Sequence, residues 1–103
     1  MSGLVLHPAA FHEINEIWEF IAADNLDAAD RIVAELRQAF EKLADFPEMG
    51  FHREELTSKP LRFFPLRDFL IAYAPEEKPL LVVAVLHTRR NPRVLAAVLR
   101  QRR

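Results

Sequence analysis

The first half of the chain carries apolar residues at the spacing of two amphipathic helices. The first helix is predicted over residues 9–23 and the second over residues 28–45. The apolar positions of the first are Phe11, Ile14, Trp18 and Ile21. Those of the second are Ala29, Ile32, Val33, Leu36, Phe40 and Leu43. Residues 24–27 interrupt the pattern and offer N-cap side chains. Because this joint is short, we expect an antiparallel helical hairpin.

The second half carries short apolar runs between turn residues, which is typical of strands. Residues 46–60 contain Pro, Gly, Ser and Thr without a sustained period and are predicted to be a loop. Three strands are expected after it, over residues 61–64, 69–74 and 80–87, and one short strand over residues 3–7 precedes the helices. The run 80–87 is apolar at both alternating sets of positions, as in a central strand covered on both faces. The short links favour an antiparallel meander.

Pro92 opens a last predicted helix over residues 93–100. The element order predicts one α+β domain over residues 1–103, in which the helical hairpin packs on a small antiparallel sheet. The residues after Arg100 are predicted to fray. The expected core consists of Leu4, Leu6, Phe11, Ile14, Trp18, Ile21, Ile32, Leu36, Phe40, Leu43, Phe69, Ile71, Tyr73, Val83 and Val85.

Composition narrows the class of protein. A chain of 103 residues with 50% hydrophobic residues fits one globular domain. The absence of cysteine excludes disulfides and thiolate catalysis. The longest apolar runs are too short for a bilayer, which requires about 20 residues. Residues 1–7 lack the basic and apolar blocks of a signal peptide. We therefore expect a cytoplasmic protein without a membrane partner.

The net charge of −1 conceals two halves of opposite charge. Residues 1–50 hold ten acidic and three basic residues, a net charge of −7. Residues 51–103 hold eleven basic and five acidic residues, a net charge of +6. Separate acidic and basic surfaces indicate a polar partner for one of them. Solvated faces with charge pairing inside the chain are the alternative explanation.

Motifs for catalysis or for a cofactor do not stand out. With Gly3 and Gly50 as the two glycines, the chain has no phosphate-binding loop. The histidines His7, His12, His52 and His87 lack the spacing of a zinc site. We therefore expect no cofactor and no metal. Three glutamates of the first helix are expected on its solvated outer face: Glu13, Glu16 and Glu19.

Basic side chains of the second half are the candidate partner-binding residues: Arg53, Arg62, Arg67, His87, Arg89, Arg90 and Arg93. Arginine carries a fixed charge and a planar donor fork that suits phosphate or carboxylate. For any single arginine, pairing with the chain's own carboxylates is the alternative. His87, Arg89 and Arg90 follow one buried strand, so we expect these three at a common edge of the sheet, where His87 titrates near neutral pH.

The order of elements and several local segments resemble the RelE/ParE superfamily of bacterial type II toxins. The matching segments are residues 17–22, 46–50, 61–65, 69–73 and 83–91. They cover nearly the whole chain, and their order and spacing carry the resemblance. The likeness is closer to the ParE branch, in which the central strand ends in a Leu-His-x-x-Arg-like segment. The resemblance implies a toxin used in plasmid stabilization.

The superfamily resemblance implies one of two activities. RelE-like members cut messenger RNA in the ribosome, and ParE-like members act on DNA gyrase. Arg89 falls where the RNA-cutting members carry a transition-state arginine. Leu70 falls where they carry another arginine, and Leu95 falls near their tyrosine, but leucine neither donates a proton nor holds a phosphate. The single tyrosine, Tyr73, is expected in the core.

These departures favour a ParE-like toxin that binds DNA gyrase without chemistry of its own. Its other expected partner is a cognate antitoxin, which would wrap the toxin with a helix and an extended segment. The antitoxin's apolar side chains would fill the groove between hairpin and sheet, and its acidic side chains would meet the arginines. Two alternatives remain: a RelE-like, ribosome-dependent mRNA endoribonuclease, and a non-toxic antitoxin-binding module.

Overall fold

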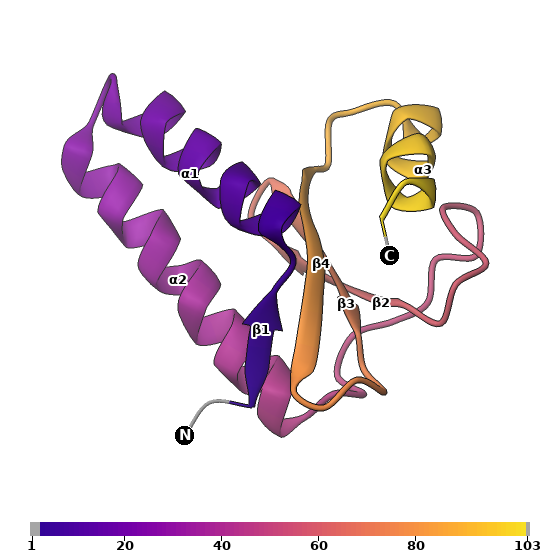
Figure 1. Cartoon of the computed structure of the whole chain (residues 1–103). Coiled ribbons are helices and arrows are strands. Elements are labelled where there is room, and N and C mark those ends of the chain that lie inside the picture. Colours follow the sequence, from indigo (N-terminus) through magenta and orange to yellow (C-terminus); the bar gives the residue numbers. More distant parts are fainter. Residues whose placement is uncertain (1–2, 103) are drawn as a thin grey trace.

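Figure 1 shows a computed structural model of the chain, in which residues 3–102 are described. The elements are β1 (Leu4–Leu6), α1 (Pro8–Ala22), α2 (Leu26–Asp45), β2 (Arg62–Leu66), β3 (Phe69–Ala74), β4 (Leu80–His87) and α3 (Pro92–Arg100). The predicted order of elements is confirmed, and each predicted boundary lies within two residues of the observed one. The helical hairpin lies on one side of the sheet and α3 on the other (Figure 1).

The two hairpin helices begin at side chains that cap them. The Nδ1 atom of His7 accepts the backbone N–H of Ala9 at 3.0 Å at the start of α1. Asn25 caps α2 from within the predicted break, because its side-chain oxygen accepts a backbone N–H at 3.0 Å. Near the turn, the indole N–H of Trp18 donates to Asp30 at 2.9 Å and ties the helices together.

The sheet has the strand order β1-β4-β3-β2 and is mixed. The pairs β2–β3 and β3–β4 are antiparallel, as predicted, but β1 lies parallel to β4, with Leu4 opposite Leu80 and Leu6 opposite Val82. The expectation of a purely antiparallel sheet was therefore wrong. The direction follows from the path of the chain. The two helices return the chain to the end of the sheet where β1 began, so β2 starts there. Two reversals in the meander then make β4 run in the same direction as β2 and β1.

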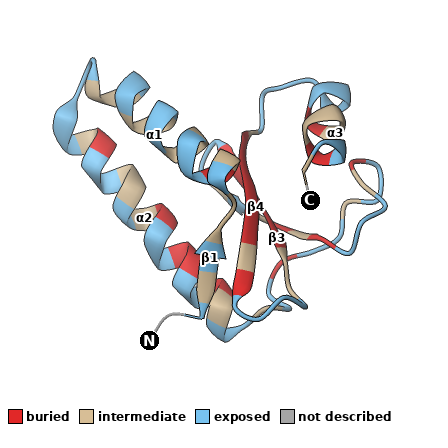
Figure 2. Cartoon of the chain, viewed as in Figure 1, coloured by how far each residue is buried: buried red, intermediate tan, exposed pale blue. Residues whose placement is uncertain are grey.

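Two apolar clusters cover the two faces of the sheet. The cluster under the hairpin joins Leu36, Phe40 and Leu43 of α2 to Phe69, Ile71 and Tyr73 of β3. The cluster on the other face joins Leu70 and Ala72 of β3 to Leu95 and Leu99 of α3 and to Leu56 and Leu61 of the loop before β2. Figure 2 shows buried residues along β4 and on the sheet-facing sides of α2 and α3. This confirms the central strand predicted from its apolar run.

Phe11 was a wrong core prediction, since it is 57% exposed. The inward side of α1 runs through Ala10, which is fully buried, and through Ile14 and Ile17. The backbone N–H of His7 donates to the β4 backbone at 2.9 Å, so the first turn of α1 is held close to β4, and the small Ala10 side chain faces it. Six further predicted core residues are half-buried: Leu4, Leu6, Ile14, Trp18, Ile21 and Ile32.

A part-buried ion pair between Glu13 and Arg102 covers the free edge of β4. Because β1 pairs with β4 only as far as Val82, the next backbone groups of β4 have no strand partner there. Glu13 accepts the N–H of Val85 at 2.9 Å, and Arg102 donates to the carbonyl of Val83 at 3.1 Å. Glu13 and Arg102 are joined by two hydrogen bonds of 2.7 and 3.0 Å. Their side chains thus occupy the position of a neighbouring strand.

This ion pair corrects two predictions from the sequence. Glu13 faces the sheet edge, whereas Glu16 and Glu19 are exposed, as expected for the outer face. The side chain of Arg102 is only 13% exposed, so the end of the chain is not frayed at this residue. Residue Arg103 lies outside the described residues.

Candidate partner-binding surface

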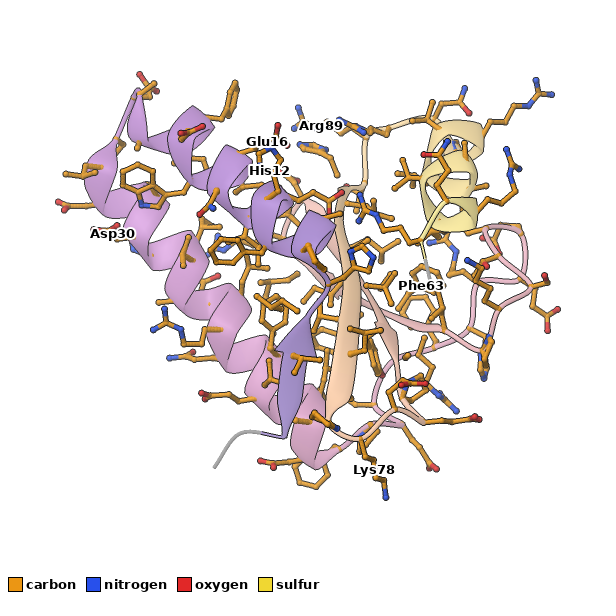
Figure 3. All side chains as sticks on the ribbon, in the orientation of Figure 1. His12, Glu16, Asp30, Phe63, Lys78 and Arg89 are labelled. Atoms are coloured by element: carbon orange, nitrogen blue, oxygen red, sulfur yellow. The ribbon has the colours of Figure 1, made fainter. Side chains whose placement is uncertain are left out.

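The seven predicted partner-binding residues do not form one surface. Arg62 begins β2 at one end of the sheet, and His87 ends β4 at the other end, since both strands are antiparallel to β3. Arg53 lies in the loop before β2. Figure 3 shows the two ends of β4 by their labelled neighbours. Lys78, in the turn before β4, and Arg89, after it, lie at opposite ends of the molecule. Arg62 is therefore separated from His87, Arg89 and Arg90, the three residues that were expected at a common edge.

Arg67 ties the sheet to the helical hairpin. It lies in the two-residue turn between β2 and β3 with a φ of 53°, in the left-handed region. Its guanidinium donates two hydrogen bonds, of 2.6 and 2.8 Å, to the carboxylate of Glu35 in α2. These bonds lower the pKa of Glu35 and raise the pKa of Arg67. Arg67 is therefore paired with a carboxylate of the chain itself, which was the alternative to binding a partner.

Arg53 and Arg62 also have partners within the chain. Arg53 forms an ion pair with Glu55 in the same loop. Arg62 donates to the carbonyl oxygens of Gly50 and Glu48, at 2.6 and 3.3 Å, and so holds the segment that follows α2. These two arginines are therefore engaged within the chain, and Arg62 lies at the end of the sheet away from His87.

Tyr73 belongs to the core, as predicted. Its hydroxyl donates to the carbonyl of Pro47 at 2.7 Å and accepts the N–H of Gly50 at 2.8 Å. Burial raises the pKa of Tyr73. A Cβ atom at Gly50 would lie 2.5 Å from this hydroxyl and 2.7 Å from the carbonyl oxygen of Phe63, so the close approach requires glycine. The hydroxyl therefore clamps a loop and faces no open surface.

Four exposed arginines follow β4, and we refer to them together as the arginine face: Arg89, Arg90, Arg93 and Arg100. None of them forms an ion pair with a carboxylate of residues 3–102. Arg93 and Arg100 lie seven residues apart, about two turns, on the side of α3 opposite the buried Leu95 and Leu99. Sequence reasoning missed Arg100, although its spacing from Arg93 was the signal that both share a helix side.

His87 is held in the turn that leads to the arginine face. Its Nδ1 atom accepts the backbone N–H of Arg89 at 3.2 Å. The ring also packs edge-on against Phe69, with 5.5 Å between ring centroids and 73° between planes. His87 therefore shapes the turn that presents Arg89.

Leu70 and Leu95 lie where the RNA-cutting members of the resembled superfamily carry an arginine and, nearby, a tyrosine. Their exposed fractions are 3% and 4%, and both side chains pack in the cluster between α3 and the sheet. Neither side chain faces a surface where a substrate would lie. The arginine face thus offers fixed positive charge, but the chain lacks the second arginine and the tyrosine that accompany it in the RNA-cutting members.

Seven of the eight exposed large apolar side chains of the described residues lie outside α3. Four lie on β1 and the hairpin: Val5, Phe11, Phe20 and Leu26. Three more follow α2: Phe46, Met49 and Phe51. Phe46 and Met49 line a depression of about 550 Å³, together with Arg62 and Lys78. These side chains are available for contact with a protein partner.

Residues 3–102 contain neither a metal-binding cluster nor a membrane-spanning helix. No group of three or more His, Asp or Glu side chains in this part of the chain is placed to hold a metal ion. No helix in the same range is long and apolar enough to cross a membrane.

Comparison with known proteins identifies the family. Residues 4–92 match the family described as the ParE toxin of the type II toxin-antitoxin system, parDE. A search of curated proteins found no match. The matched range runs from β1 to Pro92 and includes the turn that carries Arg89 and Arg90. The chain therefore belongs to the ParE toxin family of type II toxin–antitoxin systems.

Proposed function

We propose that this toxin acts in the cytoplasm, where it stops growth by binding DNA gyrase through the arginine face and α3, and that a cognate antitoxin neutralises it. The observation that carries the proposal is the segment 88–102, which contains five arginines and no acidic residue. Arg53, Arg67 and Arg102 each pair with a carboxylate of the chain. The arginine face has no such partner within residues 3–102. Its charge therefore remains available to another macromolecule.

Binding rather than RNA cleavage is supported by the places of the single tyrosine and of the residues that correspond to catalytic ones in the RNA-cutting members. Transfer of a proton to or from a ribose or phosphate requires a titratable side chain within hydrogen-bond reach. Tyr73 is buried, and its hydroxyl donates to Pro47 and accepts from Gly50, whereas Leu70 and Leu95 are core residues. His87 is held against Phe69. These contacts favour a toxin that acts by occupying its target.

The antitoxin is proposed to bind two kinds of surface. The space between hairpin and sheet, expected as its groove, is filled by the chain's own cluster. Its apolar side chains would instead contact exposed ones on β1 and α1, such as Val5 and Phe11, which are 45% and 57% exposed. Its acidic side chains would meet the arginine face. An antitoxin bound there blocks gyrase by covering the same arginines.

Growth and plasmid topology test the gyrase proposal. Strong expression of the chain alone should stop growth, and the purified protein with gyrase should leave supercoiled plasmid cleaved or relaxed. The variant Arg89→Glu/Arg90→Glu should abolish both effects while its melting temperature stays within a few degrees of the wild type. Normal growth despite abundant folded protein would refute the proposal.

A matched control separates the arginine face from net charge. Arg31→Glu/Arg37→Glu makes the same change in charge at two exposed positions of α2 and should leave toxicity intact. Cutting of ribosome-bound messenger RNA in vitro, lost in Arg89→Ala, would instead favour the RelE-like alternative. Tight antitoxin binding without toxicity would identify a non-toxic binding module.

A further inference from the structure

We infer that the arginine face binds the phosphate backbone of double-stranded DNA. The inference rests on the proposed function, because gyrase, the proposed target, acts on duplex DNA. The segment 88–102 contains five arginines and no acidic residue. Arg102 is held by Glu13, so the other four are the ones that face outward. A cluster of cations that form no ion pair with the carboxylates of residues 3–102 is the surface that a polyanion requires.

The fold turns the charge asymmetry of the sequence into an asymmetry in space. The acidic half of the sequence forms the hairpin on one side of the sheet, and α3 lies on the other side (Figure 1). Exposed hairpin carboxylates include Glu16, Glu19 and Asp27. A DNA duplex is therefore repelled from the hairpin side and attracted to the α3 side, which orients the toxin as it approaches.

The composition of the arginine face favours nucleic acid over an acidic protein. Protein interfaces are built around apolar cores. In the segment 88–102, the one large apolar side chain with substantial exposure is Val94, at 44%. The more exposed apolar residues, such as Phe11 and Phe20, lie on the hairpin. The two kinds of contact are thus separated on this toxin, with apolar contact on the hairpin and cationic contact on α3.

The absence of aromatic residues from 88–102 favours a duplex over a single strand. Proteins that bind single strands stack the bases on aromatic side chains, and this segment has none. A duplex presents only its backbone to such a surface. Arg93 and Arg100 are separated by about 10.5 Å along α3. Two cations at this separation on one side of a helix can each contact a phosphate of the same duplex.

Binding of the toxin to duplex DNA in the absence of gyrase tests this inference. The probe is a fluorescently labelled duplex of about 20 base pairs, followed by anisotropy between about 50 and 200 mM salt. Contact with four phosphates predicts that log K falls with log [salt] with a slope of about −3.6. Arg93→Glu/Arg100→Glu should reduce the magnitude of the slope by about 2 and weaken binding at least about tenfold at the lowest salt.

The variants are chosen so that loss of folding does not imitate loss of binding. An acidic residue is favourable in the first turn of a helix and unfavourable in the last, so Arg93→Glu should offset the cost of Arg100→Glu to α3. Circular dichroism and the melting temperature verify the fold of each variant. The control Arg31→Glu/Arg37→Glu on α2 has the same net charge and should keep the wild-type slope.

Several results would overturn the inference. These are a wild-type slope smaller in magnitude than about 1, equal loss of binding in the control variant, or tighter binding to a single strand of the same length. Displacement of the duplex by polyglutamate at matched charge would identify an acidic protein as the partner. Gyrase inhibition by a toxin that does not bind DNA would refute only this inference. DNA binding by a toxin that leaves gyrase unaffected would refute only the proposed function.

Discussion

Removal of the Glu13 carboxylate is expected to destabilise the fold far more than removal of an exposed carboxylate. In Glu13→Ala, the guanidinium of Arg102 loses two hydrogen bonds and the N–H of Val85 loses its acceptor. Arg102 keeps the carbonyl of Val83, but that contact does not balance its charge. A partly buried cation and an unpaired backbone donor would remain at the edge of β4.

The size of the loss follows from the burial of the pair. Breaking a fully buried ion pair by removing one partner costs about 3–5 kcal/mol. An exposed pair contributes about 0–1 kcal/mol. The side chains of Arg102 and Glu13 are 13% and 19% exposed, which places the pair nearer the buried limit. We expect Glu13→Ala to lower the free energy of unfolding by about 2–3 kcal/mol, which lowers the Tm by roughly 10–20 °C.

Urea unfolding followed by the fluorescence of the single tryptophan, Trp18, measures this loss. The control is Glu16→Ala, because the Glu16 side chain is 64% exposed and should cost less than about 0.5 kcal/mol. In the double variant Glu13→Ala/Arg102→Ala, the combined loss should be smaller than the sum of the single losses by about 1 kcal/mol or more. A Glu13→Ala variant as stable as Glu16→Ala would refute the reasoning.

Three further predictions concern the core and its loop clamp. Gly50→Ala should lower the free energy of unfolding by about 1–3 kcal/mol in urea unfolding, because the new methyl group meets Tyr73 and the Phe63 backbone; unchanged stability would contradict the packing. Absorbance of the single tyrosine should titrate above the usual pKa of about 10. Because the folded-state pKa of Tyr73 is raised, the free energy of unfolding should be unaffected by this group below about pH 10 and should fall as the pH rises through the folded-state pKa. An absorbance titration with its midpoint at or below about pH 10 would refute the burial argument. Phe11→Ala should cost less than about 1 kcal/mol in thermal unfolding, whereas Phe40→Ala, at a buried position, should cost about 3–5 kcal/mol.

Local patterns predicted the elements of this fold well, because their signals lie within a few residues. The apolar spacing of α2 and the capping residue Asn25 defined the second helix. The direction of β1 was not predicted, since it depends on how the chain returns through the hairpin. Phe11 was placed in the core because an aromatic residue at helical spacing reads as buried. In the structure the close approach of α1 to β4 selects Ala10 for that position.

The candidate site was predicted only in part, because pairing between distant side chains leaves no mark in a sequence. Arg67 meets Glu35 across 32 positions of sequence. Glu13 meets Arg102 across 89 positions. Arg89 and Arg90, whose exposure follows from their place just after a buried strand, were foreseen as a pair. Only coordinates distinguish such free arginines from paired ones.

The contact between Glu13 and Arg102 can form only late in the synthesis of the chain, because its two partners lie far apart in the sequence. The ribosome adds about 5–20 residues per second. It therefore needs about 4–18 s to synthesise the 89 positions that separate the two partners. The edge of β4 stays without its cover until synthesis reaches Arg102. The cover of this edge is therefore among the last contacts of the domain to form.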